Sequence, residues 1–115
     1  MSQPLVFFDI AGQDDTELRR FYSSVFGWES DQAGQFSVEV VSPINGAIRK
    51  DPTEKRMYVG VPDVSAALTD IERSGGTIDA ARFEVPGVVV LGLFKDPAGN
   101  PMGVVELDGN RLRIP

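Results

Sequence analysis

Two stretches decide the fold: residues 14–27, with the sequence DDTELRRFYSSVFG, and residues 63–76, with the sequence DVSAALTDIERSGG. Both carry apolar residues at the spacing i, i+3, i+4 and i+7, which is the period of an amphipathic helix. Each stretch begins with aspartate, a common N-cap residue, and ends at glycine, which readily closes a helix in the left-handed conformation. The sequence therefore predicts two helices, at about Asp14–Phe26 and Val64–Ser74.

Short strand-like segments surround the two helices in the same order. An apolar run precedes each helix, at Leu5–Ile10 and at Met57–Val61, and the second run lies in a predicted strand, Arg56–Val61. The polar segment Asp51–Glu54 contains a proline and separates the two halves. Each half therefore has the order β-α-β-β-β. The other predicted strands are a short one around Trp28, Phe36–Val41, Ala47–Lys50, one that begins at Thr77, Val88–Phe94 and Met102–Leu107.

The repeated order predicts an α+β fold built from paired βαβββ modules. At 115 residues the chain has the size of one domain. We expect a single domain over 1–115, with module 1 at about 4–51 and module 2 at about 55–108. A sheet that carries one helix has a second face, which must be covered or stay open. If two such sheets lie edge to edge, their uncovered faces form one trough, which would suit a small-molecule ligand.

Composition excludes several classes of function. Eleven Lys and Arg stand against seventeen Asp and Glu, so the net charge is −6 and nucleic acid would be repelled. The basic cluster at Arg49–Lys50 and Lys55–Arg56 is interrupted by acids, and we interpret it as a solvated turn. The chain has no cysteine, which excludes disulfides and thiolate metal sites. It has neither a long apolar run nor a basic leader, so the sequence predicts a cytoplasmic protein without a membrane span.

Strand alternation predicts which side chains line the trough. In the first strand Phe8 and Ile10 share one side, whereas Phe7 and Asp9 point the other way. In the strand before the second helix, the same rule places Val59 and Val61 beneath the helix and Arg56 and Tyr58 in the trough. Two alternatives remain open for Arg56 and Asp9. They bind a ligand, or they form a structural ion pair with each other.

Aromatic residues offer a second kind of contact. Phe7, Phe36 and Tyr58 have the planar faces needed to stack on a flat ligand. The alternative is that these rings fill a collapsed cleft. Trp28 is expected to pack at a module edge or in a dimer contact rather than against ligand.

Three segments resemble the vicinal oxygen chelate superfamily, which contains glyoxalase I, bleomycin-resistance proteins and extradiol dioxygenases. The resemblance covers nearly the whole chain and implies paired βαβββ modules around a U-shaped cleft. The residues that carry it are Phe7–Ile10, Phe21–Tyr22 and Phe26–Trp28 for the first module, Val61–Asp63 and Ser74–Gly76 for the second, and Asp96–Asn100, similar to the family's Asp-Pro-x-Gly-Asn turn.

The same resemblance implies where metal ligands would stand. The metal enzymes of the family hold a divalent ion with His and Glu, and those positions fall on Phe7, Arg56, Gly103 and the segment Ala47–Lys50, none of which offers a ligand. The chain has no histidine at all. Glu106 stands three residues beyond the family's final ligand position, so alternation turns it away from the cleft. The sequence therefore predicts no metal and no cofactor.

Two hypotheses about function remain. The first is a metal-free binding protein of the bleomycin-resistance type, a homodimer that holds a small, partly aromatic molecule. The second is an enzyme of the lyase, isomerase or dioxygenase kind that acts on a small carbonyl or aromatic substrate, through Asp9, Tyr58 and Arg56 or an unusual metal site. The candidate ligand-binding residues are Phe7, Asp9, Phe36, Arg56, Tyr58 and Gly103.

Overall fold

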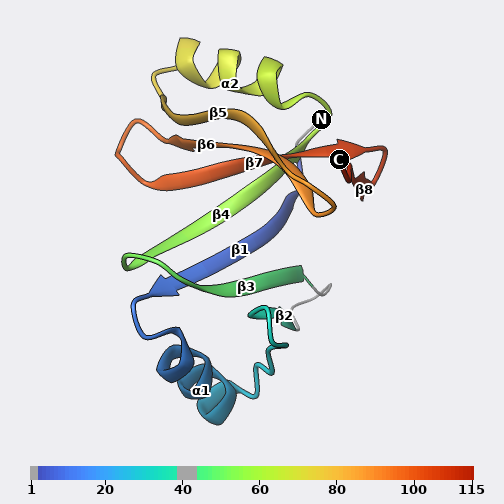
Figure 1. Ribbon diagram of the computed structural model, residues 1–115. Coiled ribbons are helices and arrows are strands. Elements are labelled where there is room, and N and C mark those ends of the chain that lie inside the picture. Colours follow the sequence, from blue (N-terminus) through green and yellow to red (C-terminus); the bar gives the residue numbers. More distant parts are fainter. Residues whose placement is uncertain (1–2, 39–43) are drawn as a thin grey trace. The chain divides into compact units, whose positions relative to one another are not determined.

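A computed structural model describes residues 3–38 and 44–115 (Figure 1). Within those residues it contains eight strands and two helices, which confirms the predicted α+β class. The chain divides into two units. Val6–Arg56 is called the N-terminal unit below, and Met57–Pro115, together with the segment that ends at Leu5, is called the C-terminal unit.

The N-terminal unit places one helix on a three-stranded sheet. Strand β3 lies in the middle, parallel to β1 and antiparallel to β2. The predicted strand Ala47–Lys50 is the second half of β3. Of the predicted strand Phe36–Val41, residues 39–41 lie outside the described residues. The elements are β1 (Leu5–Gly12), α1 (Asp15–Phe26), β2 (Gln35–Val38) and β3 (Ile44–Lys50).

Helix α1 begins and ends where the sequence predicts. The Asp14 carboxylate accepts the backbone N–H of Glu17 at 3.0 Å and caps the first turn. Gly27 closes the helix with φ of 73°, in the left-handed region that glycine adopts without strain. One side of α1, with Leu18 and Tyr22, packs over a cluster that the sheet supplies. That cluster consists of Phe8, Phe36, Val38, Ile44 and Ile48.

The predicted strand around Trp28 is wrong. Trp28 lies in a loop, and its ring stacks between those of Tyr22 and Phe36 at centroid distances of 5.3 and 5.6 Å. Farther along this loop, the Asp31 carboxylate accepts the backbone N–H groups of Ala33 and Gln35, both at 2.9 Å. This local turn satisfies backbone groups that a strand would have paired with a neighbour, and burial of the indole ring fixes the segment against the core.

The C-terminal unit repeats the pattern with four strands in the order β4-β7-β6-β5. Strands β4 and β7 are parallel, and the other neighbours are antiparallel. A short strand, β8, pairs with the end of β7 and was not expected from the sequence. The elements are β4 (Glu54–Val61, of which Glu54–Arg56 belong to the N-terminal unit), α2 (Val64–Arg73), β5 (Thr77–Val85), β6 (Val89–Lys95), β7 (Pro101–Asp108) and β8 (Arg111–Leu112).

Helix α2 holds the core of its unit. Val64 and Leu68 are 0% and 4% exposed and pack on Val61, Phe94 and Val104. Because burying a Val or Leu side chain contributes about 1.5–3 kcal/mol, this contact is a principal source of stability for the unit. Val59 packs against the same cluster, so the predicted placement of Val59 and Val61 beneath the helix is confirmed.

Glu106 ties β7 to the start of α2. Its carboxylate accepts the backbone N–H of Val64 at 3.0 Å and forms ion pairs with Arg113 at 3.1 Å and Arg82 at 3.5 Å. Glu106 lies two residues after Val104 and therefore on the helix-covered face, as alternation predicts. The hydrogen bond from Val64 lowers the pKa of Glu106 below its ordinary value; burial opposes this shift, and Arg82 and Arg113 reinforce it.

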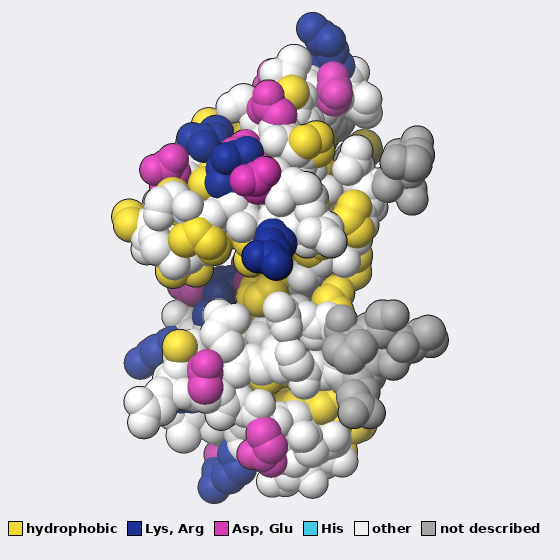
Figure 2. Space-filling model, turned by 90° about the vertical axis from the view of Figure 1, so that its right-hand side faces the viewer, with side chains coloured by type: hydrophobic (Ala, Val, Ile, Leu, Met, Phe, Trp, Pro, Cys, Tyr) yellow, Lys and Arg dark blue, Asp and Glu magenta, His cyan; other side chains and the backbone are white. Residues whose placement is uncertain are grey.

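Charges of both signs lie beside one another on the surface. On the face drawn in Figure 2, lysine and arginine side chains alternate with aspartate and glutamate, so this face offers no basic stripe of the kind that binds nucleic acid. Neither helix in the described part of the chain is long and apolar enough to cross a lipid bilayer.

Replacing Glu106 should make stability less dependent on acid. Because the pKa of Glu106 is lower in the folded than in the unfolded chain, its carboxylate stabilises the fold above the unfolded-state pKa, and that contribution is lost as pH falls through the folded pKa. We expect Glu106→Gln to reduce the free energy of unfolding by about 1–3 kcal/mol at pH 7 and to flatten its decline towards pH 3. Urea titrations over this pH range measure both effects. Glu72→Gln, at an exposed position of α2, is the control, and equal losses in the two variants would contradict the capping role.

Candidate functional site

Each unit has one sheet face that its helix covers and an opposite face, called its open face here. Phe8 belongs to the cluster beneath α1, so alternation places Phe7 and Asp9 on the open face of the N-terminal unit. Strand register adds residues from β3 to this face, since Asp9 pairs with Ala47 and the residue two positions farther along is Arg49. That Phe7 and Asp9 line a ligand trough stays a prediction.

Asp9 is held by an arginine that the sequence analysis assigned to a solvated turn. Asp9 is 3% exposed, and its two carboxylate oxygens lie 3.0 Å from Nε and 3.2 Å from Nη2 of Arg49. Such a two-point contact fixes both the guanidinium and the carboxylate. The available signal was the position of Arg49 two residues after Ala47 in a predicted strand, which gives the two residues the same face.

Arg49 gathers three carboxylates. Besides Asp9, it contacts Asp51 at 2.9 Å and also forms an ion pair with Glu54. Glu54 in turn accepts hydrogen bonds from Arg56, at 3.3 Å to Nε and 3.4 Å to Nη2. Three carboxylates and two guanidiniums thus form one network, which we call the Arg49 network, with a formal charge of −1.

The network favours the charged forms of Glu54 and Arg49. Burial alone would raise the pKa of Glu54, but hydrogen bonds from Arg49 and Arg56 outweigh it and lower that pKa below its ordinary value. Burial would likewise lower the pKa of Arg49, yet its bonds to Asp9, Glu54 and Asp51 raise that pKa further above its ordinary value. At neutral pH, Glu54 and Arg49 therefore act as a fixed negative and a fixed positive charge.

Phe36 does not share the open face with Phe7. It is 6% exposed and packs edge-to-face on Phe8 at a centroid distance of 5.5 Å, beneath α1. The prediction that Phe36 faces the trough is therefore wrong. Phe36 in β2 and Phe8 in β1 are both register partners of Gly46 in β3, and residues in register across a sheet point to the same face. With no side chain on Gly46, the Phe8 ring lies directly over the strand.

On the open face of the C-terminal unit, Tyr58 covers Gly103. The two residues are register partners in β4 and β7, and a Cβ atom on Gly103 would lie 2.5 Å from Cδ2 of Tyr58. Tyr58 is 7% exposed, so its ring is largely removed from water. The flat aromatic ring therefore occupies the space that a side chain at Gly103 would take.

The residues that the family resemblance places at metal-ligand positions do not have side chains that fit a divalent ion. Phe7 has no donor atom, Arg56 is a cation already bonded to Glu54, and the space at Gly103 is filled by the Tyr58 ring. Within residues 3–38 and 44–115, no three or more Asp, Glu, His or Cys side chains are grouped so as to hold a metal ion.

A side chain at position 103 should collide with the tyrosine. We expect Gly103→Ala to lower the free energy of unfolding by about 1–3 kcal/mol, the usual cost of overpacking a full core. Gly12→Ala is the matched control in a strand, since its Cβ would meet only Leu18, at an ordinary 3.4 Å. Urea unfolding of both variants measures the difference. Equal effects would mean that the ring of Tyr58 moves aside and that position 103 is open to larger residues.

Comparison with known proteins identifies sequence relatives. A family model described as a glyoxalase-like domain matches residues 6–105. Two mycobacterial proteins, each named "Putative glyoxylase CFP32", from Mycobacterium bovis and Mycobacterium tuberculosis, are 25% identical over 111 residues, which covers 84% of this chain. The match covers 42% of those proteins, so this chain spans less than half the length of the curated relatives it matches.

Solved structures share the fold at low sequence identity. A Streptomyces coelicolor methylmalonyl-CoA epimerase variant in complex with 2-nitronate-propionyl-CoA matches with a TM-score of 0.65 and 16% identity, covering 91% of this chain and 98% of that one. A methylmalonyl-CoA epimerase from Mycobacterium tuberculosis matches with a TM-score of 0.59 and 13% identity, covering 90% and 87%. Identities this low establish a common fold and nothing about a shared ligand.

Proposed function

We propose a function from one premise: this chain belongs to the glyoxalase-like domain family, within the vicinal oxygen chelate superfamily. The proposal is that it binds a small molecule without using a divalent metal ion. The observation that carries it is the filled position at Gly103, where the Tyr58 ring takes the place of the family's last metal-ligating side chain. Phe7 and Arg56 at two further ligand positions support the same conclusion.

The ligand we propose has an anionic oxygen and a planar group. Glu54 accepts hydrogen bonds from Nε and Nη2 of Arg56 and thereby orients the guanidinium. A guanidinium held in this way is a suitable partner for the carboxylate or phenolate of a ligand. Phe7 supplies an aromatic face in the same unit. Sequestration of an aromatic antibiotic, as in bleomycin-resistance proteins, is the form of binding that this set of residues favours.

Catalysis on a small carbonyl or aromatic substrate is the second candidate, and Asp9 is the observation that favours it. A buried carboxylate such as Asp9, which is 3% exposed, is a group that an enzyme could use as a base. Against this, Oδ1 of Asp9 already accepts a hydrogen bond from Arg49 and Oδ2 forms an ion pair with it, which favours a structural role. Binding without chemistry therefore remains the primary proposal.

Metal removal should leave the protein unchanged. We expect the purified protein to carry no stoichiometric divalent metal, and its melting temperature to be the same with and without a chelator. The reason is that a tightly held metal would add its binding energy to the folded state, and chelation would then remove it. Elemental analysis and thermal-shift measurements test this. A bound equivalent of nickel, zinc, iron or manganese that raises the melting temperature would refute it.

The same assay identifies the ligand class. A thermal-shift screen of planar antibiotics and small carbonyl compounds supplies hits, whose affinity calorimetry then measures. Arg56→Met should weaken an anionic aromatic hit by about 1.5–3 kcal/mol, the usual worth of a charged hydrogen bond. Arg73→Met, at a side chain 78% exposed, is the control. If Arg56→Met instead costs more than about 3 kcal/mol of stability with no effect on binding, Arg56 is structural.

We also propose that the protein is a homodimer. No residue of α1, which lies wholly within the described chain, is buried, and Phe21, Val25 and Phe26 are 51%, 58% and 58% exposed. An exposed aromatic surface of this kind is typical of a protein interface. We expect sedimentation at tens of micromolar to show a dimer, Val25→Glu to yield monomers, and Ser24→Glu to change nothing. A monomeric wild-type protein would exclude the dimer.

A further inference from the structure

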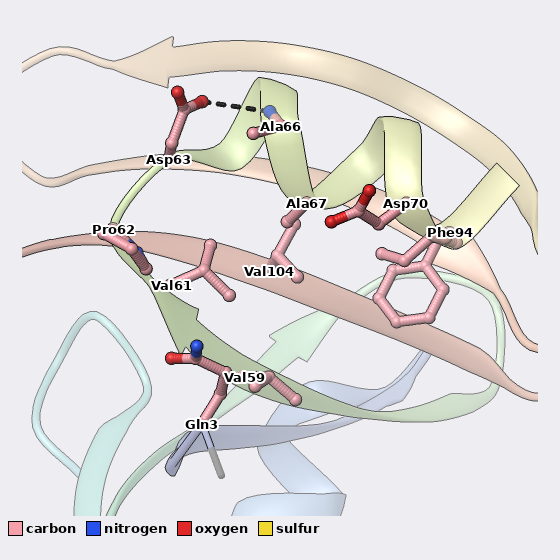
Figure 3. A pocket seen from close by; sticks show the side chains of 11 residues that line it. Gln3, Val59, Val61, Pro62, Asp63, Ala66, Ala67, Asp70, Phe94 and Val104 are labelled. Atoms are coloured by element: carbon pink, nitrogen blue, oxygen red, sulfur yellow. Dashed lines mark hydrogen bonds between the residues drawn. The ribbon is translucent and has the colours of Figure 1, made fainter. Parts of the chain in front are cut away.

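The helix-covered side of the C-terminal unit contains a pocket that the proposed function does not use. It lies between α2 and strands β4 and β7, and its volume is about 410 Å³ (Figure 3). This volume is within the range of small-molecule sites. Tyr58 and Gly103, on the open face of the same unit, do not line it. Its walls are formed by Gln3, Val59, Val61, Pro62, Asp63, Ala66, Ala67, Asp70, Ile71, Phe94 and Val104.

We propose that this pocket is a second binding site, and that its ligand is a small organic cation with an apolar body, such as an arylalkyl ammonium ion. The proposal concerns a different face from the proposed ligand site. An experiment that contradicts one of these two proposals therefore leaves the other unaffected.

The body of the ligand would meet an apolar wall. Val59, Val61 and Val104 rise from the two strands towards α2, and the Phe94 ring closes one end (Figure 3). The helix contributes Ala66 and Ala67, whose methyl groups leave the space that larger side chains would have filled. Burying an apolar ligand here would remove both the ligand and the wall from water, which is favourable at roughly 25 cal/mol per Å².

The charge of the ligand follows from the ionisable residues around the pocket. Asp63 and Asp70 are the ionisable side chains that line it within the described residues, and both are acidic. They lie seven positions apart, with Ala66 and Ala67 between them, and thus on one stripe of the helix and its N-cap. The polar amide of Gln3 stands on the strand side. The set therefore favours a cation and repels an anion.

Neither aspartate is saturated by its protein contacts. Oδ1 of Asp63 accepts the N–H of Ala66 at 3.0 Å, a cap that retains the negative charge. The ion pair between Asp70 and Arg73 is long, at 4.0 Å, and both side chains are 78% exposed. Exposed pairs of this kind contribute little, so Arg73 is a weak competitor for a ligand's ammonium group.

The test compares three probes of similar shape by nuclear magnetic resonance titration of the full chain: phenethylammonium, the neutral 2-phenylethanol and the anionic phenylacetate. We expect phenethylammonium to bind at least fivefold more tightly than the other two, with the largest shifts at Ala66, Ala67 and Asp70. Asp70→Asn should weaken the cation about fivefold or more and leave the alcohol unchanged. Glu72→Gln, which removes an acid from α2 outside the pocket, should have no effect.

A second variant tests the cavity itself. Ala67→Leu should fill the pocket and weaken both the cation and the alcohol, whereas Ser65→Leu on the same helix should not. If Ala67→Leu fails to fold, Asp70→Asn at its exposed site still decides the charge selectivity. Equal binding of the three probes, or shifts that map to Arg56 or Tyr58, would overturn the proposal.

Discussion

The period-two alternation of side chains along strands is the constraint on which the rest of this structure depends. A helix packed on a sheet requires apolar residues at every second position, as Val59 and Val61 provide beneath α2. The intervening positions are released from that requirement and can carry chemistry. Asp9 follows the core residue Phe8, and Gly103 precedes the core residue Val104. The core residues and the candidate ligand-binding residues thus occupy neighbouring positions in the same strands.

The Arg49 network shows how carboxylates are compensated when they leave water. Taking carboxylates such as Asp9 out of water is costly unless a partner of opposite charge compensates. The compensating partner must carry positive charge. In this chain two guanidiniums supply it, and Arg49 alone contacts three carboxylates. Family membership establishes the fold and does not identify the ligand, because ligand choice depends on the side chains of the site.

The two faces of the C-terminal unit offer different environments. On the sheet face away from α2, the Tyr58 ring lies on Gly103 and fills the space there. Its helix-covered face holds a pocket, because Ala66 and Ala67 are too small to fill the space beneath α2. A small residue therefore has a different effect at Gly103 than at Ala66 and Ala67. Where a neighbouring ring reaches the vacant space, the surface is filled, and where none does, a cavity remains.

The sequence by itself determined the features that depend on local pattern: both helices with their caps, most of the strands, and the sides on which Phe7, Asp9, Val59 and Glu106 lie. Those features follow from helix and strand periods that neighbouring residues fix. Tertiary structure decided the rest. Arg49 donates a hydrogen bond to Asp9, forty positions away in the chain. Trp28 lies in a loop, where its ring stacks on that of Phe36, and Phe36 packs beneath the helix. Such contacts depend on strand register and ring packing between distant segments, which no local period encodes.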